Sequence, residues 1–367
     1  MTAPRFATAF AAARAGFLAS VVAAAVTFSA SAVAQTAPNP FPEPIKPPEK
    51  PPAAKFIAPK ATPKAETPAP SAQKKSVPAK TAAPVVPDDP NADLAYGAYQ
   101  QGLYRTAFNI ALKRAQETGD PKSMTLLGEL YSNALGIKRD DAKAAEWYKQ
   151  AADRGDREAM FALGMMKMSG RPAPPNREEG ARLLASSAKL GKAAAAYNLG
   201  LLYLEGQIFP QDIKRAAELF RQAADAGNPE AQYALATFYK EGRGVEKNLQ
   251  ESARLMRAAA TADNLDAEVE YGIALFNGTG TPKDVPLAIS VLTRAARQNS
   301  PIAQNRLARI LVDGLGAPAD KVQGFKWHLI AKTAGGSDPD LDAQFAQLPP
   351  LEKAKAEELA KKWFGTK

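Results

Sequence analysis

Cysteine is absent from this 367-residue sequence, and histidine occurs once, as His328. Without cysteine the chain cannot form a disulfide framework, a thiolate zinc site, a catalytic thiol or the lipid anchor of a bacterial lipoprotein. A single histidine also excludes a metal centre built from several imidazoles, and nothing else in the sequence implies a cofactor. Aromatic residues make up only 8% of the chain, against 30 prolines and 46% hydrophobic residues. The apolar residues must therefore be unevenly distributed.

The positive net charge does not indicate nucleic-acid binding. The total of +9 divides into +2 for residues 1–34, +3 for residues 35–90 and +4 for residues 91–367. In the last and longest segment basic and acidic residues are interleaved, whereas a nucleic-acid surface needs a basic stripe that neutralises phosphates. We therefore expect no nucleic-acid partner.

Residues 1–34 have the layout of a secretory signal peptide. Arg5 and Arg14 precede an apolar stretch from Phe17 to about Phe28, and small residues follow up to Ala34. This pattern predicts export to the periplasm with cleavage after about Ala34. A retained membrane anchor is the alternative, but the stretch is rich in Ala, Val and Ser and is weakly apolar for the roughly 20 residues that a span needs.

Residues 35–90 form a segment rich in Pro, Ala and Lys. It holds 16 of the 30 prolines and almost no large apolar side chains. Such a composition cannot bury enough surface to offset the entropy of ordering, so we predict a disordered, extended linker. Its lysines could make weak contact with cell wall or anionic lipid, and a simple solvated spacer is the competing interpretation.

A fixed period of 36 residues begins at residue 119. Six consecutive units follow one another without an insertion or deletion, starting at Gly119, Gly155, Gly191, Gly227, Asp263 and Asn299. Five of the six carry an N-cap type of residue at their second position, and Asp or Asn stands at the twenty-second position of all six. The sixteenth position is Gly in five units and Ala134 in the first, as expected where a helix ends. Each unit is thus predicted to be a helix-turn-helix hairpin.

The unit beginning Gly227-Asn228-Pro229-Glu230-Ala231-Gln232-Tyr233-Ala234-Leu235, followed by Gly242-x-Gly244, resembles the Sel1-like repeat (SLR) family, which is related to tetratricopeptide repeats. The resemblance covers residues 119–334. It implies an all-α fold, a right-handed α-solenoid of six helix-turn-helix repeats plus capping helices. Residues 91–118 look like a degenerate tetratricopeptide-like capping unit, and residues 335–367 should form a C-terminal capping region. There, a helix from Pro350 to Phe364 should cover the open end with Leu351, Leu359, Trp363 and Phe364.

The family resemblance further implies a scaffold or regulator that binds proteins, with exported members acting in cell-envelope signalling or polymer production. Some exported members carry a disulfide in each repeat, and this chain has none. The penicillin-binding or lactamase-like activities reported for those members are therefore not carried over.

Catalytic motifs are incomplete. Ser186-Ser187-Ala188-Lys189 matches S-x-x-K, but the companion motifs are missing, and Ser187 occupies a small-residue packing position of the repeat. Gly242-Arg243-Gly244 lacks the preceding strand of a phosphate loop and is interpreted as a turn between helices. His328, beside Trp327, is interpreted as a partly buried histidine with satisfied hydrogen bonds.

By analogy with tetratricopeptide folds, the seventh, eleventh, fourteenth and fifteenth positions of each first helix should face a concave groove. The first three of these positions are unusually apolar, and a charged rim of Glu205, Lys240, Glu241, Arg309 and Asp313 accompanies them. The predicted partner-binding residues are Phe161, Met165, Met168, Tyr197, Leu201, Leu204, Tyr233, Lys240, Phe276 and Arg309. Packing of one unit on the next is the alternative explanation for the aromatic residues among them.

The sequence therefore predicts a non-enzymatic scaffold or adaptor in the cell envelope, whose groove binds another protein or a peptide segment. Two alternatives remain. One is a periplasmic regulator that inhibits a membrane sensor or an exopolysaccharide pathway, and the other is a cell-wall hydrolase, for which no catalytic constellation is evident.

Overall fold

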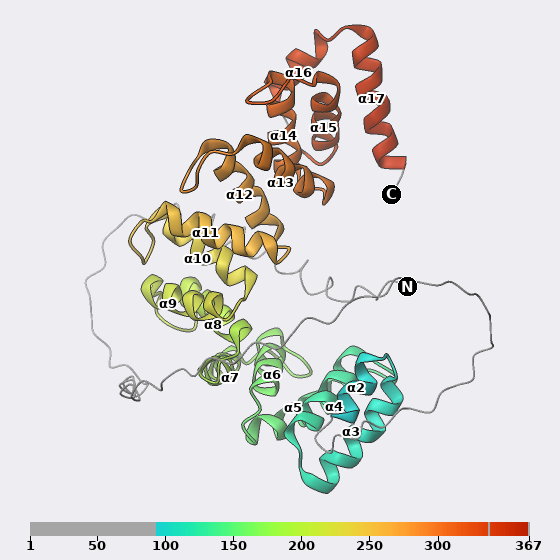
Figure 1. Cartoon of the computed structure of the whole chain (residues 1–367). Helices are drawn as coiled ribbons and strands as arrows, with labels where there is room; N and C mark the ends of the chain where they lie inside the picture. The colour runs from blue at the N-terminus through green and yellow to red at the C-terminus, as the bar shows by residue number, and fades with distance from the viewer. Residues whose placement is uncertain (1–92, 337, 366–367) are drawn as a thin grey trace, which may run out of the picture. The chain divides into compact units, whose positions relative to one another are not determined.

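A computed structural model describes residues 93–336 and 338–365. These residues form sixteen helices, α2 to α17, and the same residues contain no strand (Figure 1). The predicted signal peptide and the whole of the predicted linker lie outside the described residues. The described part is an α-solenoid in which helical hairpins follow one another in chain order, as the 36-residue period predicts.

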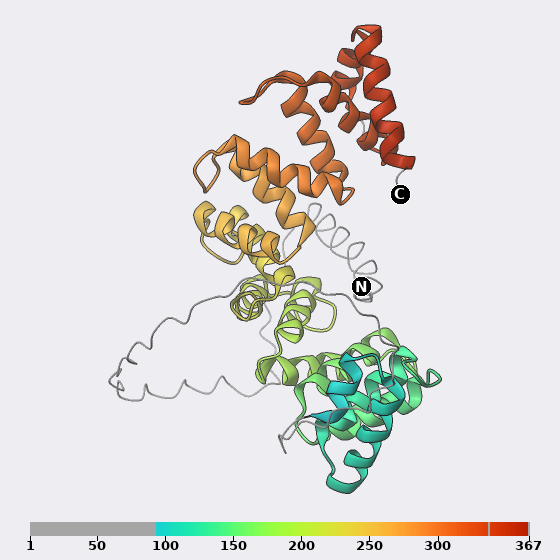
Figure 2. The same cartoon turned by 45° about the vertical axis from the view of Figure 1, so that its right-hand side comes forward.

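Each repeat contributes two helices of 13 residues. The first helices are α4 (Pro121–Asn133), α6 (Arg157–Ser169), α8 (Ala193–Glu205), α10 (Pro229–Glu241), α12 (Leu265–Asn277) and α14 (Pro301–Asp313). The second helices are α5 (Asp141–Asp153), α7 (Arg177–Lys189), α9 (Ile213–Asp225), α11 (Leu249–Thr261), α13 (Val285–Arg297) and α15 (Lys321–Thr333). Each first helix packs against the second helix of its own unit, and that helix packs against the first helix of the next (Figures 1 and 2).

Capping residues set the start and the end of these helices. All six Asp or Asn residues at the twenty-second position accept a hydrogen bond from a backbone N–H three residues on. The predicted first-helix caps also do so, except Lys192, which is not an N-cap type and pairs with Glu158 instead. The five glycines at the sixteenth position are left-handed, with φ of 64–75°, and Ala134 adopts the same conformation with φ of 56°.

The core is built from small residues and leucines on facing helices. Residues at the fifth repeat position are at most 2% exposed, and five of the six at the ninth position are buried, with Tyr271 half-buried. Close approach of the two helices in a hairpin needs a small tenth residue: an added Cβ at Gly200 would lie 2.7 Å from Cε1 of Phe220. Ring packing and small residues together set the spacing of the helices.

Two helices, of 7 and 15 residues, precede the repeats. α2 (Leu94–Gln100) and α3 (Tyr104–Thr118) pack on each other, and α3 packs on α4. The hydroxyl of Tyr99 donates a 2.6 Å hydrogen bond to Oε1 of Glu129 in α4. Burial and this carboxylate raise the pKa of Tyr99. The degenerate unit expected at residues 91–118 is thus a helical pair joined to the first repeat.

At the C-terminal end the structure partly corrects the sequence-based expectation. α17 (Pro350–Gly365) packs on α15 as expected, and the Trp363 ring lies 5.3 Å from the Trp327 ring. However, Leu351 is 81% exposed and Phe364 is 46% exposed, so they do not cover the array. Instead, Ala356 and Ala360 of α17 are buried. Their small side chains let α17 pack closely on α15.

A short helix, α16 (Pro339–Ala346), was not predicted from the sequence. Its N-cap Asp338 precedes Pro339, the same cap-proline pair that starts α4 at Asp120-Pro121. The Asp338-Pro339 pair is therefore a sequence signal from which the start of α16 could be predicted.

Candidate functional site

The ten predicted partner-binding residues lie on α6, α8, α10, α12 and α14, and we call them the first-helix face. The seventh, eleventh and fourteenth positions are three or four residues apart, so on each helix they share one side. The structure places most of these side chains at intermediate exposure, neither fully buried nor free in solvent. Their individual contacts decide which of them remain available to a partner.

On α6, Phe161, Met165 and Met168 are half-buried. The Nζ of Lys192 lies 5.5 Å from the centroid of the Phe161 ring, so a cation of the next unit already covers part of this ring. Met168 packs against Gly180 of α7, where an added Cβ would lie 2.8 Å from Cγ of Met168. Met168 therefore also fills space within its own hairpin.

Tyr197 on α8 is a correction to the predicted site. It is only 2% exposed, and its ring centroid lies 5.6 Å from that of the fully buried Phe220. In this unit the aromatic ring joins the core, so Tyr197 cannot be a surface anchor. Leu201 and Leu204, on the same helix, are half-buried and remain at the surface.

Tyr233 on α10 is half-buried against Ala259, Ala260 and Ala267. Burial raises its pKa to about 12, and the carboxylates of Asp266, Glu270 and Glu241 add to the shift. The pKa of Asp266 is itself raised, first by burial and then by Glu270. Three carboxylates therefore act on Tyr233, as a smaller addition to the effect of burial.

Lys240 and Phe276 lie on neighbouring first helices. The Nζ of Lys240 is 2.7 Å from Oε2 of Glu270, an ion pair between α10 and α12. This pair borders a small recess of about 100 Å³ that is also lined by Met256 and Ile273. The Phe276 ring is half-buried, and Nζ of Lys283 lies 5.6 Å from its centroid.

Arg309 is a second correction. Its Nε and Nη2 each donate a 2.8 Å hydrogen bond to the carboxylate of Asp338, which is 3% exposed. The guanidinium joins α14 to the N-terminus of α16 and is not free to select a partner. Burial alone would raise the pKa of Asp338, but hydrogen bonds from Asn305, the Leu341 N–H and Arg309 outweigh burial and lower it.

The remaining residues of the predicted rim behave differently from one another. Glu205 is bound by Nη2 of Arg177 at 2.6 Å, so its charge is already paired. Glu241 and Asp313 are exposed. The free rim charge is therefore acidic.

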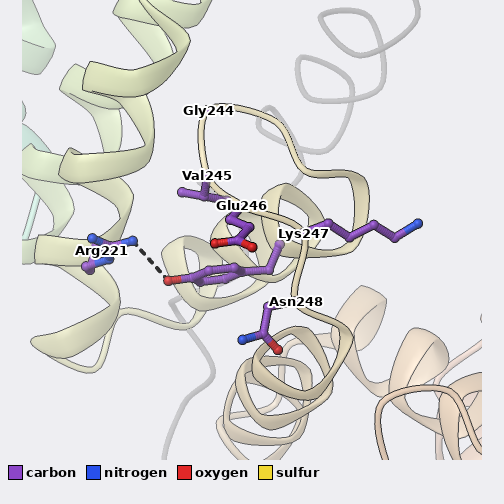
Figure 3. A pocket seen from close by; sticks show the side chains of 7 residues that line it. Arg221, Gly244, Val245, Glu246, Lys247 and Asn248 are labelled. Carbon is purple, nitrogen blue, oxygen red and sulfur yellow. Dashed lines mark hydrogen bonds between the residues drawn. The ribbon is translucent and has the colours of Figure 1, made fainter.

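The structure also shows a polar recess of about 480 Å³ that was not predicted from the sequence (Figure 3). It is lined by Arg221 of α9, Tyr239 of α10 and the turn at residues 244–248. The only sequence signal there is the Gly242-x-Gly244 turn. Nη2 of Arg221 donates a 2.9 Å hydrogen bond to the Tyr239 hydroxyl (Figure 3). Because these groups bond to each other, we assign no ligand to this recess.

The residues that resembled catalytic groups have structural partners. The hydroxyl of Ser187 is fully buried and donates a 2.7 Å hydrogen bond to the carbonyl oxygen of Arg157, at the start of α6 in the same unit. His328 corrects the prediction of a partly buried histidine with satisfied hydrogen bonds. It is fully buried, with Nε2 at 2.8 Å from Oδ1 of Asp342, and its Nδ1 has no hydrogen-bond partner among the described residues. Both glycines of Gly242-Arg243-Gly244 have positive φ and form the turn between α10 and α11.

In residues 93–336 and 338–365, no group of three or more His, Cys, Asp or Glu side chains is arranged to hold a metal ion. None of the described helices combines the length and the apolar character that a bilayer crossing requires.

Comparison with known families decides the identity of the repeats. The Sel1 repeat model matches six consecutive segments, residues 121–156, 157–192, 193–228, 229–264, 265–300 and 301–336. The chain belongs to the Sel1 repeat family. Sel1 repeat solenoids are generally non-catalytic scaffolds that bind other proteins.

Solved structures of Sel1 repeat proteins share the fold. A Sel1 repeat protein from Oxalobacter formigenes is 25% identical, with a TM-score of 0.56 over 66% of this chain and 97% of that one. A protective antigen of uropathogenic Escherichia coli strains that displays an SLR fold is 26% identical, with a TM-score of 0.50. That match covers 71% of this chain and 64% of the antigen, slightly less than two thirds of its length. No curated protein matches the chain significantly.

Proposed function

We propose that this Sel1 repeat protein is a non-enzymatic adaptor of the cell envelope that binds a partner protein along the first-helix face. The observation that carries the proposal is the row of half-buried apolar side chains on consecutive first helices. Phe161, Leu201, Leu204 and Phe276 keep part of their surface in solvent, although a monomer gains by burying such groups. Apolar anchors next to charged groups are the usual composition of a protein-binding surface.

The place in the envelope rests on residues 1–34, which have the composition of an export signal and lie outside the described residues. The non-enzymatic part of the proposal is supported by Ser187 and His328. The Ser187 hydroxyl and Nε2 of His328 bond to the fold itself, at Arg157 and Asp342, and both side chains are fully buried.

A quantitative pull-down from envelope extract tests the proposal. Full-length protein should retain a stoichiometric partner, and Phe161→Ala combined with Leu204→Ala should weaken the retention at least about tenfold, because two anchors are lost. Leu351→Ala is the matched control, since Leu351 is apolar and 81% exposed but lies on α17. Helical content by circular dichroism confirms that all variants fold.

Equal retention by all variants, or no retained protein at all, would overturn the proposal. Hydrolysis of peptidoglycan by the purified protein, abolished by Ser187→Ala, would instead support the cell-wall hydrolase.

A further inference from the structure

The surface formed by α10 and α12 is apolar at its centre and strongly acidic around it. Tyr233, Ile273 and Phe276 are half-buried there, on neighbouring first helices. The two helices carry five carboxylates, Glu230, Glu241, Asp266, Glu268 and Glu270, against a single lysine, Lys240, a net charge of −4. The chain as a whole is basic, at +9. This α10–α12 face is therefore a local reversal of the charge of the protein.

Only part of this negative charge is neutralised within the fold. Glu268 is 1% exposed and forms an ion pair with Arg294. Its Oε2 also accepts a 2.9 Å hydrogen bond from Nε2 of Gln298. Glu270 is paired with Lys240. Among the described residues, no ion pair involves Glu230, Glu241 or Asp266. Burial is the main cause of the raised pKa of Tyr233, and the carboxylates of Asp266, Glu270 and Glu241 raise it further.

The repeat itself shows what is missing at Tyr233. Phe161 and Tyr233 both stand at the seventh position of their units. Lys192, at the second position of the next unit, lies over the Phe161 ring. The residue equivalent to Lys192 for Tyr233 is Asn264, whose side chain instead accepts a 2.9 Å hydrogen bond from the N–H of Ala267 and caps α12. No lysine or arginine of the described residues lies over the Tyr233 ring. Three carboxylates thus act on a ring over which the described part of the chain places no cation.

We propose that the α10–α12 face binds a lysine- or arginine-rich segment of the partner protein, with one cationic side chain over the Tyr233 ring and against the carboxylates of Asp266 and Glu241. Apolar side chains that flank this cation pack on Ile273 and Phe276. The inference rests on the proposed protein-binding function and adds the chemistry of the bound segment. Attraction of a cation to an aromatic face is strengthened by nearby carboxylates that have no other partner.

Fluorescence anisotropy with defined peptides tests the inference. The probe is a labelled dodecapeptide of three Lys-Pro-Ala-Leu repeats, with matched peptides that carry glutamate or norleucine in place of every lysine. Full-length protein should bind the lysine peptide at least about fivefold more tightly than the norleucine peptide, and should bind the glutamate peptide least. Affinity should fall as salt is added, because exposed charges are screened.

Matched protein variants identify the site. Asp266→Asn with Glu241→Gln should weaken the lysine peptide about fivefold, and Tyr233→Leu should weaken it as well. Glu178→Gln with Glu358→Gln changes the net charge by the same amount at exposed positions on α7 and α17, and should leave the affinity unchanged. Circular dichroism again verifies folding.

Four outcomes would overturn the inference. Equal binding of the lysine peptide to all variants would show unspecific attraction, and equal affinity for the lysine and norleucine peptides would remove the role of charge. Loss of self-association in the Asp266 and Glu241 variant, seen by sedimentation, would make a second copy the occupant. If Phe161→Ala with Leu204→Ala abolishes partner retention while this acidic variant retains both partner and peptide, the adaptor function stands and the basic-segment inference fails.

Discussion

Arg309 and Asp338 form a two-pronged ion pair that joins the last repeat to the C-terminal cap. The two guanidinium nitrogens lie 2.8 Å from the two carboxylate oxygens, and Asn305 donates a third hydrogen bond at 2.7 Å. Asp338 also caps α16 through the N–H of Leu341. One buried carboxylate therefore holds both the start of α16 and its attachment to α14.

Replacing Arg309 should loosen the cap. Arg309→Met leaves Asp338 buried with fewer partners, and we expect a loss of about 2 kcal/mol in the free energy of unfolding, below the range for a fully buried pair because Arg309 is partly exposed. Hydrogen exchange should accelerate first in α16 and α17. Arg306→Met, at an exposed position of the same helix, is the control and should change little. Equal effects of the two substitutions would contradict this role of Arg309.

The same contact predicts a pH dependence. The pKa of Asp338 is lowered in the folded state from its ordinary value of 3.8, so the carboxylate stabilises the fold above about pH 4 and this contribution is lost as the pH falls through the lower, folded-state pKa. Asp338→Asn should therefore lower the melting temperature at neutral pH, and the difference from the wild type should shrink below about pH 4. Asp340→Asn is the control, because Asp340 is 78% exposed. A difference that stays constant with pH would refute the assignment.

Ala134 should be improved by glycine. Its φ of 56° lies in the left-handed region, which the other five units fill with glycine at the same position. Ala134→Gly removes the steric cost of Cβ there and should raise the free energy of unfolding by about 1 kcal/mol. Ala354→Gly, at an exposed position within α17, should lower it by about 0.5–1 kcal/mol, because glycine has more freedom to lose in a helix. Chemical denaturation measures both, and the same sign for both would argue against the conformational explanation.

Replacing Gly200 by alanine, the residue that the fourth unit has at the same repeat position, should destabilise the protein. An added Cβ would lie within 2.9 Å of two ring atoms of Phe220, so we expect Gly200→Ala to cost about 1–2 kcal/mol, less than a full overpacking penalty because alanine favours the helix. The fourth unit combines Ala236 with Met256 where the third has Gly200 and Phe220. Adding Phe220→Met should therefore recover part of the loss in a double-mutant cycle, and strict additivity would contradict the proposed contact.

Local signals made the repeats predictable from the sequence. The Asp or Asn at each twenty-second position acts through a backbone amide three residues away, so its effect is visible in the order of the residues alone. The half-exposed placement of Leu201 and Leu204 follows from helical periodicity in the same way.

Contacts between distant residues were not predictable in this way. Phe161 and Tyr197 share a repeat position, yet only Tyr197 is buried, and the ring that it packs on is Phe220, where the preceding unit has Leu184. The 36-residue period predicts the direction in which each side chain points, but not the size of the side chain on the neighbouring helix against which it packs. Arg309 likewise finds its partner in the cap, beyond the periodic region, so its pairing left no trace in the repeat pattern.

The identical 36-residue length of the units has a consequence for how such a protein can vary. Every second helix begins at a cap supplied by its own unit, and each helix packs chiefly on the one before and the one after. A whole 36-residue unit could thus be deleted or duplicated, and the units on either side would pack on each other through the same kind of helix contact. The length of the surface that can contact a ligand would then change by one unit at a time, while the capping helices at the two ends stayed unchanged.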